Sequence, residues 1–299
     1  MANLKEVRNR IASVNSTQQI TKAMKMVSAA KLKRATNAIV DLRPYANKLK
    51  EMLANLSASI ETGASPYLQE REPARVLIVV VSSNRGLAGA FNTNAIKTAN
   101  NLIADKYADQ FAAGNVSVVA IGRKAQDYYT KRNFNVIGDN NEVYSDLTFT
   151  NVSKITEAIM QGFIDGKFDR VELVYNHFRN AAMQVLVAEQ LLPVPKAVEE
   201  DTKLKNKAEV SQTDYILEPS QQAIVEQLIP KNIKIQLYRA VLDSHASEHG
   251  ARMTAMDKAT ENAGELLKSL KLSYNQARQA AITTELTEIV SGAAALSNG

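Results

Sequence analysis

The chain has 299 residues, enough for one large domain or two smaller ones, and 45% of them are hydrophobic, which is ordinary for a protein with a buried core. It has no cysteine, which excludes disulfides, thiol nucleophiles and cysteine-ligated metals, and its net charge of +5 suits an acidic partner. No apolar run reaches the roughly 18 residues that a membrane span needs. The amphipathic start contains Glu6 and lacks an apolar core segment, so we expect it to belong to the mature protein rather than to a targeting peptide.

Residues 2–60 are predicted to be helical nearly throughout. Their apolar side chains recur at intervals of three and four, the stripe by which one helix packs along another in a coiled coil. The stripe slips in register near Gln18 and continues beyond Pro44, and Gly63 and Pro66 are expected to end the helix. Its members are Leu4, Val7, Ile11, Val14, Ile20, Met24, Val27, Leu49, Leu53, Leu56 and Ile60.

The pattern changes at about residue 74. The β-branched run RVLIVVVSS (75–83) is typical of a strand that is buried on both faces. Strands and helices then alternate, which predicts a small α/β domain with a largely parallel sheet. The further strands are expected at 116–122, 133–137, 170–178 and 183–194, and the main helices at about 90–110 and 151–164.

Helix is predicted again after Pro219 and, with a break at Pro230, to the end of the chain. Apolar and small side chains again recur at intervals of three and four, so this helix is expected to pair with the first one in antiparallel fashion. The members of this second stripe are Met253, Met256, Thr260, Ala263, Leu267, Leu270, Tyr274, Ala277 and Ala281.

The predicted fold is therefore of the α/β class, with a long antiparallel coiled coil of N- and C-terminal helices and an inserted Rossmann-like α/β domain. The predicted parts are an N-terminal coiled-coil helix (1–62), the α/β domain (74–198), a charged connecting segment (199–219) and a C-terminal coiled-coil helix (220–299).

The last predicted helix includes the stretch SYNQARQAAITTELTEIVSGAAAL (273–296), in which large apolar side chains are few and scattered. The stripe of side chains that would pack against another helix is mostly alanine in this stretch. The distinctive side chains can form hydrogen bonds but bury poorly, so the composition indicates shallow polar contacts. These are Arg278, Gln279, Thr283, Thr284 and Glu285.

A possible metal motif, H-x-x-E-H, is formed by residues 245–249, with both histidines on one face of a helix. One interpretation is a zinc hydrolase in which Glu248 acts as the base. The other is a solvated helix face. Because the chain has no cysteine and only one other histidine, His177, we expect no catalytic metal site.

The loop SSNRGLAGAFN (82–92) follows a buried strand and opens a helix, which is where phosphate-binding loops lie. It matches neither G-x-G-x-x-G nor the P-loop pattern, and Gly86 with Gly89 alone is a weak signal. We therefore expect a tight turn that presents Arg85 rather than a nucleotide site.

The first helix is strongly basic, which leaves open an alternative function as a basic coiled-coil protein that binds nucleic acid. Few aromatic residues are present to stack on bases, and the apolar stripe already occupies one face, so a solvated or partner-facing basic side is favoured. The cations are Lys5, Arg8, Arg10, Lys22, Lys25, Lys31, Lys33, Arg34 and Arg43, against Glu6 and Asp41.

Three stretches together resemble the gamma subunit of F-type ATP synthase, of the bacterial type. They are IASVNSTQQITKAMKMVSAAKLKRA near the start, SSNRGLAGAFN after the first strand, and SEHGARMTAMDKATENA with LSYNQARQAAITTELTEIVSGAAAL at the end. The resemblance implies a non-catalytic rotor shaft whose helices thread the hexameric ring of alpha and beta subunits. Its α/β domain would rest, with the epsilon subunit, on the c-ring of the membrane sector.

The same resemblance implies that ion flow through the membrane sector drives ATP synthesis, and that the reverse reaction is ATP hydrolysis. It implies no cofactor, no metal and no nucleic acid partner. The expected location is peripheral, at the cytoplasmic face of the cell (inner) membrane.

The resemblance also implies a set of subunit contacts. Asn84 and Ala88 depart from the family's loop, where an acid and a cysteine are usual, which puts an acid-based ion pair there in doubt. Lys25 is added because it adjoins the family position of Met24 and should face an acidic loop of a neighbouring subunit. The complete set is Met24, Lys25, Arg85, Arg252, Arg278, Gln279, Thr283, Glu285 and Glu288.

Overall fold

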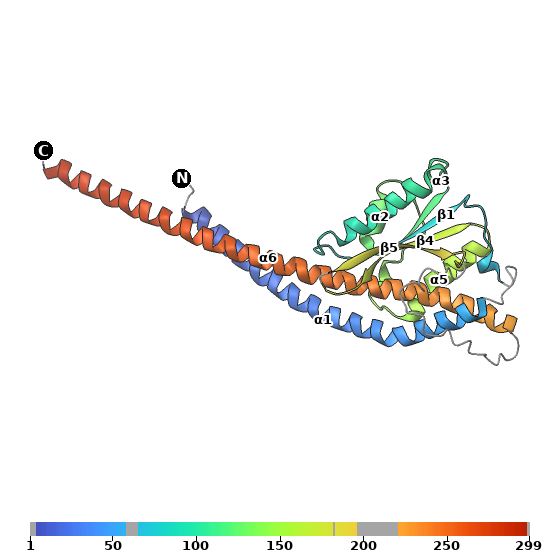
Figure 1. Ribbon diagram of the computed structural model, residues 1–299. Helices are drawn as coiled ribbons and strands as arrows, with labels where there is room; N and C mark the ends of the chain where they lie inside the picture. The colour runs from blue at the N-terminus through green and yellow to red at the C-terminus, as the bar shows by residue number, and fades with distance from the viewer. Residues whose placement is uncertain (1–3, 58–64, 182, 196–220, 298–299) are drawn as a thin grey trace. The chain divides into compact units, whose positions relative to one another are not determined.

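The computed structural model describes residues 4–57, 65–181, 183–195 and 221–297 (Figure 1). The predicted connecting segment 199–219 lies outside these residues, as does Gly63, which was expected to end the first helix. Across the described ranges, no helix has an apolar stretch long enough to cross a membrane.

The chain divides into two compact units. The helical unit consists of Met1–Ala29 and Arg252–Gly299, and the sheet unit consists of Ala30–Ala251. Two long helices contribute to both of them: α1 (Leu4–Ser57) and α6 (Gln221–Ser297).

The sheet unit contains one five-stranded sheet with the strand order β3-β2-β1-β4-β5. The strands β1, β2, β3 and β4 pair in parallel, and β5 pairs antiparallel with β4. The predicted long terminal helices with an inserted Rossmann-like domain are therefore confirmed. The strands are β1 (Val76–Val81), β2 (Val116–Ile121), β3 (Asn135–Val136), β4 (Arg170–Phe178) and β5 (Gln184–Leu192).

Helices cover both faces of this sheet, which explains why β1 is a continuous apolar run. Alternate side chains of β1 enter two separate cores: Leu77 and Val79 pack with α5 and α6, whereas Ile78 and Val80 pack with α2 and α4. Every residue of β1 is buried. The shorter helices are η1 (Pro66–Leu68), α2 (Phe91–Lys106), α3 (Ala108–Ala112), α4 (Arg123–Thr130), η2 (Asn141–Tyr144) and α5 (Phe149–Ile164).

The predicted break at Pro230 is wrong, because α6 runs through this residue without interruption. A proline inside a helix costs about 3 kcal/mol. Ile229 and Ile233 on either side of it are buried in the core against the sheet, and each buried side chain of this size contributes roughly 1.5–3 kcal/mol. Packing on the sheet therefore outweighs the local cost of the proline.

Candidate functional site

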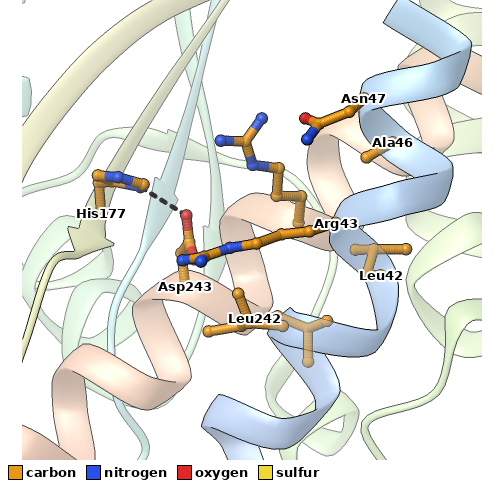
Figure 2. A pocket seen from close by; sticks show the side chains of 9 residues that line it. Leu42, Arg43, Ala46, Asn47, His177, Leu242 and Asp243 are labelled. Carbon is orange, nitrogen blue, oxygen red and sulfur yellow. Dashed lines mark hydrogen bonds and ion pairs between the residues drawn. The ribbon is translucent and has the colours of Figure 1, made fainter.

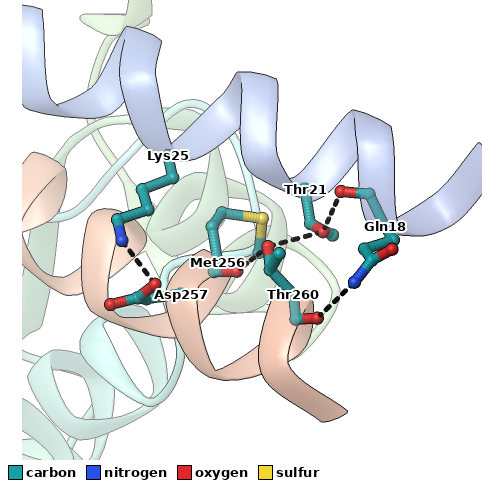
Figure 3. Close-up of polar contacts among 6 residues, drawn as sticks. All are labelled: Gln18, Thr21, Lys25, Met256, Asp257 and Thr260. Atoms are coloured by element: carbon teal, nitrogen blue, oxygen red, sulfur yellow. Dashed lines mark hydrogen bonds and ion pairs between the residues drawn. The ribbon is translucent and has the colours of Figure 1, made fainter. Parts of the chain in front are cut away.

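In the helical unit, α1 and α6 run antiparallel and are joined by polar side chains (Figure 3). Thr260 Oγ1 lies 2.8 Å from Thr21 Oγ1, and Gln18 Nε2 donates to the Thr260 carbonyl at 3.4 Å. Thr21 is buried and its hydroxyl donates to the Gln18 carbonyl at 3.0 Å. These contacts form a polar layer where the apolar stripe of α1 is predicted to slip, and they fix which residues of the two helices face each other.

Lys25 and Met24 lie next to this layer. Lys25 Nζ is 2.5 Å from Asp257 Oδ1, so the cation that was expected to face another subunit has an acidic partner within the chain. The Lys25 side chain is 41% exposed and that of Asp257 is 59% exposed, and such a solvent-accessible pair contributes about 0–1 kcal/mol. Lys25 thus remains available for a second contact, and Met24 is half-buried beside it.

The last part of α6 has no α1 beside it. Because the pairing is antiparallel, the register set by Thr21 and Thr260 places the described start of α1, Leu4, opposite the region of Ala277. The remaining 20 or so residues of α6 extend beyond it by about 30 Å, and Figure 1 shows the C-terminal end running past the start of α1. All five predicted contact residues of this segment are exposed: Arg278, Gln279, Thr283, Glu285 and Glu288.

The same segment carries an apolar stripe that the sequence analysis missed. Ile282, Leu286, Ile289 and Val290 are 48–68% exposed and follow one another at intervals of four, three and one, which places them on one side of the helix. The spacing is visible in the sequence, but polar residues separate these side chains, so the stretch has no continuous apolar run. An exposed apolar surface of this kind marks a site of protein contact.

The loop between β1 and α2 caps the N-terminus of a neighbouring helix, α4. The backbone amides at a helix N-terminus are the groups that would hold a phosphate. Here the first three amides of α4 already donate to the loop: Arg123 N to Asn84 Oδ1 at 3.0 Å, Lys124 N to the Ser83 carbonyl at 3.1 Å, and Ala125 N to Ser82 Oγ at 3.0 Å. The loop is thereby held against α4, and Arg85 and Leu87 are exposed on it. The absence of a nucleotide site at the start of α2 stays a prediction.

Asn84 has a structural role that the acid usual at this position could not fill. Its Oδ1 accepts from the amide of Arg123, and its Nδ2 donates to the Asn141 carbonyl at 2.8 Å. A carboxylate can accept but cannot donate. The departure from the family pattern therefore ties the loop to the segment before α5. Ala88, the second departure, is buried.

A small pocket in the sheet unit lies between α1, α6 and the end of β4 (Figure 2). His177 Nδ1 is 2.6 Å from Asp243 Oδ2, and the Asp243 side chain is 2% exposed. Arg43 and Arg239 line the same pocket. Burial raises the pKa of Asp243, and His177 and the two arginines oppose this shift.

This shift predicts a pH effect on stability. Folding raises the pKa of Asp243, so the protonated side chain contributes to the free energy of unfolding. This contribution is complete below the ordinary pKa of a carboxyl group and is lost as the pH rises through the pKa of Asp243 in the folded chain. Asparagine has no charge to gain, so the unfolding free energy of Asp243→Asn should increase relative to that of the parent as the pH rises through this range. The measurement is the urea unfolding free energy of both chains at several acidic pH values. Asp109→Asn, at an exposed position, is the control, and an equal pH trend in both variants would contradict the assignment.

His245 and His249 face each other across one turn of α6. Their Nε2 atoms are 3.1 Å apart, and the ring of His245 stacks on that of Tyr144 with centroids 5.7 Å apart. Burial, together with the carboxylate of Glu248, raises the pKa of Tyr144. Among the residues that the structure describes, no group of three or more metal-binding side chains is present. The zinc hydrolase hypothesis thus finds no third ligand there.

Arg252, the remaining predicted contact residue, is buried rather than exposed. A buried guanidinium is held by its own chain, so this residue is less accessible to another subunit than the sequence suggested. Arg85 and the exposed residues of the α6 end remain the accessible members of the predicted set.

Comparisons with known proteins match the whole chain. Residues 3–296 match the family model described as ATP synthase. An ATP synthase gamma chain of Cytophaga hutchinsonii is 54% identical over 299 residues, covering 100% of both chains, and one of Chlorobium limicola is 46% identical with the same coverage. In fold, the chain is similar to one in the mitochondrial ATP synthase of Euglena gracilis (OSCP/F1/c-ring), with a TM-score of 0.67, 22% identity and coverage of 98% of this chain and 94% of that one.

Proposed function

Because this chain belongs to the ATP synthase family, among the gamma chains that form the central stalk of the F1 rotor, we propose that it is a non-catalytic shaft. It couples ion flow through the membrane sector to ATP synthesis and hydrolysis in other subunits. The alternative of a nucleic-acid-binding coiled coil gains no support from the comparisons.

The observation that carries this proposal is the apolar stripe at the end of α6. Ile289 and Val290 are about two-thirds exposed, although side chains of this type are usually buried. A ring of subunits around this helix would cover them. The helix α6 is continuous from Ile233, which is buried against the sheet, to this end.

The partners that we infer follow from this assignment. The alpha and beta subunits surround the exposed end of α6, and the epsilon subunit and c-ring contact the α/β domain (74–198). The paired helices (1–62 and 220–299) form the shaft. The complex lies at the cytoplasmic face of the cell (inner) membrane, and this chain is peripheral to it.

Within this assembly, we assign the exposed polar residues of α6 to contacts with the ring: Arg278, Gln279, Thr283, Glu285 and Glu288. Met24, Lys25 and Arg85 are assigned to contacts with beta subunits, and Arg252 supports the shaft from within because it is buried. The basic surface of α1 suits acidic loops on the ring.

Co-purification tests the proposed function. The full chain, carrying an affinity tag and isolated from its own cells, should bring alpha and beta subunits with it in a 3:3:1 assembly, a ratio that follows from the alternating hexameric ring. The measurement is mass spectrometry of the intact complex. Recovery of the chain alone, or with nucleic acid that resists physiological salt, would overturn the assignment.

Replacing Gln279 by leucine tests the polar contacts. Gln279 and Thr283 share one face, and the Thr283 hydroxyl donates to the Gln279 carbonyl at 2.9 Å, so the exposed amide of Gln279 is the group left to bind the ring. A lost hydrogen bond costs about 0.5–1.5 kcal/mol, or roughly 2- to 12-fold in an equilibrium. We expect altered steady-state ATPase of the assembled complex with normal assembly yield.

The control for this experiment is Thr284→Val, which removes a hydroxyl from a different face of the same helix. That hydroxyl donates to the Ala280 carbonyl at 2.9 Å within α6. Its loss should leave turnover unchanged. Normal turnover in Gln279→Leu with normal yield would show that the amide makes no contact with the ring.

A further inference from the structure

We propose that His245 and His249 form a binding site for a divalent transition-metal ion, with Zn²⁺ as the representative ion. This proposal goes beyond the rotor function and does not rest on it. The two residues are one turn apart on α6, and their Nε2 atoms point at each other across 3.1 Å.

The separation of the two nitrogens suits a shared ion. Imidazole nitrogens bind Zn²⁺ at about 2.0–2.1 Å, so a 3.1 Å separation corresponds to an N–metal–N angle of about 100°. That angle lies between the ligand–metal–ligand angles of octahedral and tetrahedral coordination. The helix therefore presents both nitrogens at chelating distance without any change of its backbone.

The surroundings hold the two rings in place. The ring of His245 stacks on Tyr144 with an interplanar angle of 25°, and the ring of His249 meets that of His245 edge-on with centroids 4.5 Å apart. His249 is buried, whereas His245 is partly exposed, so an ion from solvent would meet His245 first. Glu248, which is also buried, adds a negative charge beside the pair.

Binding would follow a simple exchange. In the contact between the two imidazoles, the Nε2–H of one ring donates a hydrogen bond to the Nε2 of the other. The ion takes the Nε2 lone pairs of both rings: the donating ring gives its Nε2 proton to water and takes up a proton at Nδ1, so both rings bind as neutral imidazoles. Among the described residues no group of three metal-binding side chains is present, so water completes the coordination and the ion exchanges freely.

The full chain without a histidine tag, freed of metal by a chelator, provides the test. Titration with Zn²⁺ by calorimetry should show one equivalent bound, and Cu²⁺ should give an electron paramagnetic resonance spectrum with two nitrogen ligands. His245→Gln and His249→Gln should each weaken Zn²⁺ binding at least tenfold. Since His245 is partly exposed, His245→Gln should fold normally even if His249→Gln does not.

The third histidine of the chain supplies the control. His177 binds Asp243 in a separate pocket, so His177→Gln should keep the full Zn²⁺ equivalent. The proposal is overturned if the parent takes up no zinc, if His245→Gln retains tight binding, or if His177→Gln loses it. Thermal unfolding of each metal-free variant checks that a lost signal reflects lost ligands.

Discussion

Replacing Gly122 by alanine should destabilise the folded chain by about 2–5 kcal/mol, the range of severe backbone and packing defects. Gly122 lies between β2 and α4 with a φ of +112°, which L residues rarely adopt. An added Cβ would stand 2.3 Å from the Ser82 carbonyl oxygen and 2.7 Å from its carbon. Both are backbone atoms of the loop after β1, so no side chain can move aside. Urea unfolding of the full chain measures the loss.

Gly114 is the matched control, because it has a φ of +75° and nothing within 4 Å of an added Cβ. Gly114→Ala should cost only the conformational penalty, about 1–2 kcal/mol. A loss in Gly122→Ala no larger than in Gly114→Ala would show that the loop after β1 can move away from α4.

Introducing a charge into the apolar stripe should prevent assembly while leaving the chain folded. Ile289 is 68% exposed, so Ile289→Glu should not change the unfolding of the chain itself. In the proposed complex this side chain is covered by the ring. Loss of its burial costs about 1.5–3 kcal/mol, and burying a carboxylate adds to that. We therefore expect assembly with alpha and beta subunits to weaken at least 10-fold, and more than 100-fold when Leu286→Glu is added.

Thr284→Glu introduces the same charge on the opposite side of the helix from Leu286 and serves as the control. Thr284 contributes no large apolar side chain and its hydroxyl bonds within the helix, so this variant should lower the assembly yield less than Ile289→Glu does. The measurement is the fraction of chain recovered in the intact complex at equal expression. Equal yields for Ile289→Glu and Thr284→Glu would show that the stripe is not covered in the complex.

The sequence predicted those parts of the fold that depend on local pattern. The predicted run at 75–83 contains β1. Side chains of a strand alternate between the two faces of the sheet, and because helices cover both faces here, all the side chains of β1 are apolar. The predicted break at Pro230 was wrong because burial of Ile229 and Ile233 against the sheet outweighs the cost of the proline. The strands that bury these two side chains are distant in sequence, so local pattern does not reveal them.

The geometry of the candidate site depends more on contacts between residues that are far apart in the sequence. The partner of Lys25 is 232 residues away, and the polar layer joins Gln18 to Thr260, so neither could be derived from local spacing. The exposure of the last part of α6 follows only from the register of the two helices. The amides filled by Asn84 and Ser82 likewise required the approach of α4 to the loop.

The capping of α4 by the loop after β1 also bears on how the sheet unit is held together. Ser82, Ser83 and Asn84 accept hydrogen bonds from the first three amides of α4, so they serve as the N-terminal cap that α4 lacks in its own sequence. A substitution in this loop is therefore expected to act on α4, a helix about 40 residues further along the chain, as well as on the loop itself.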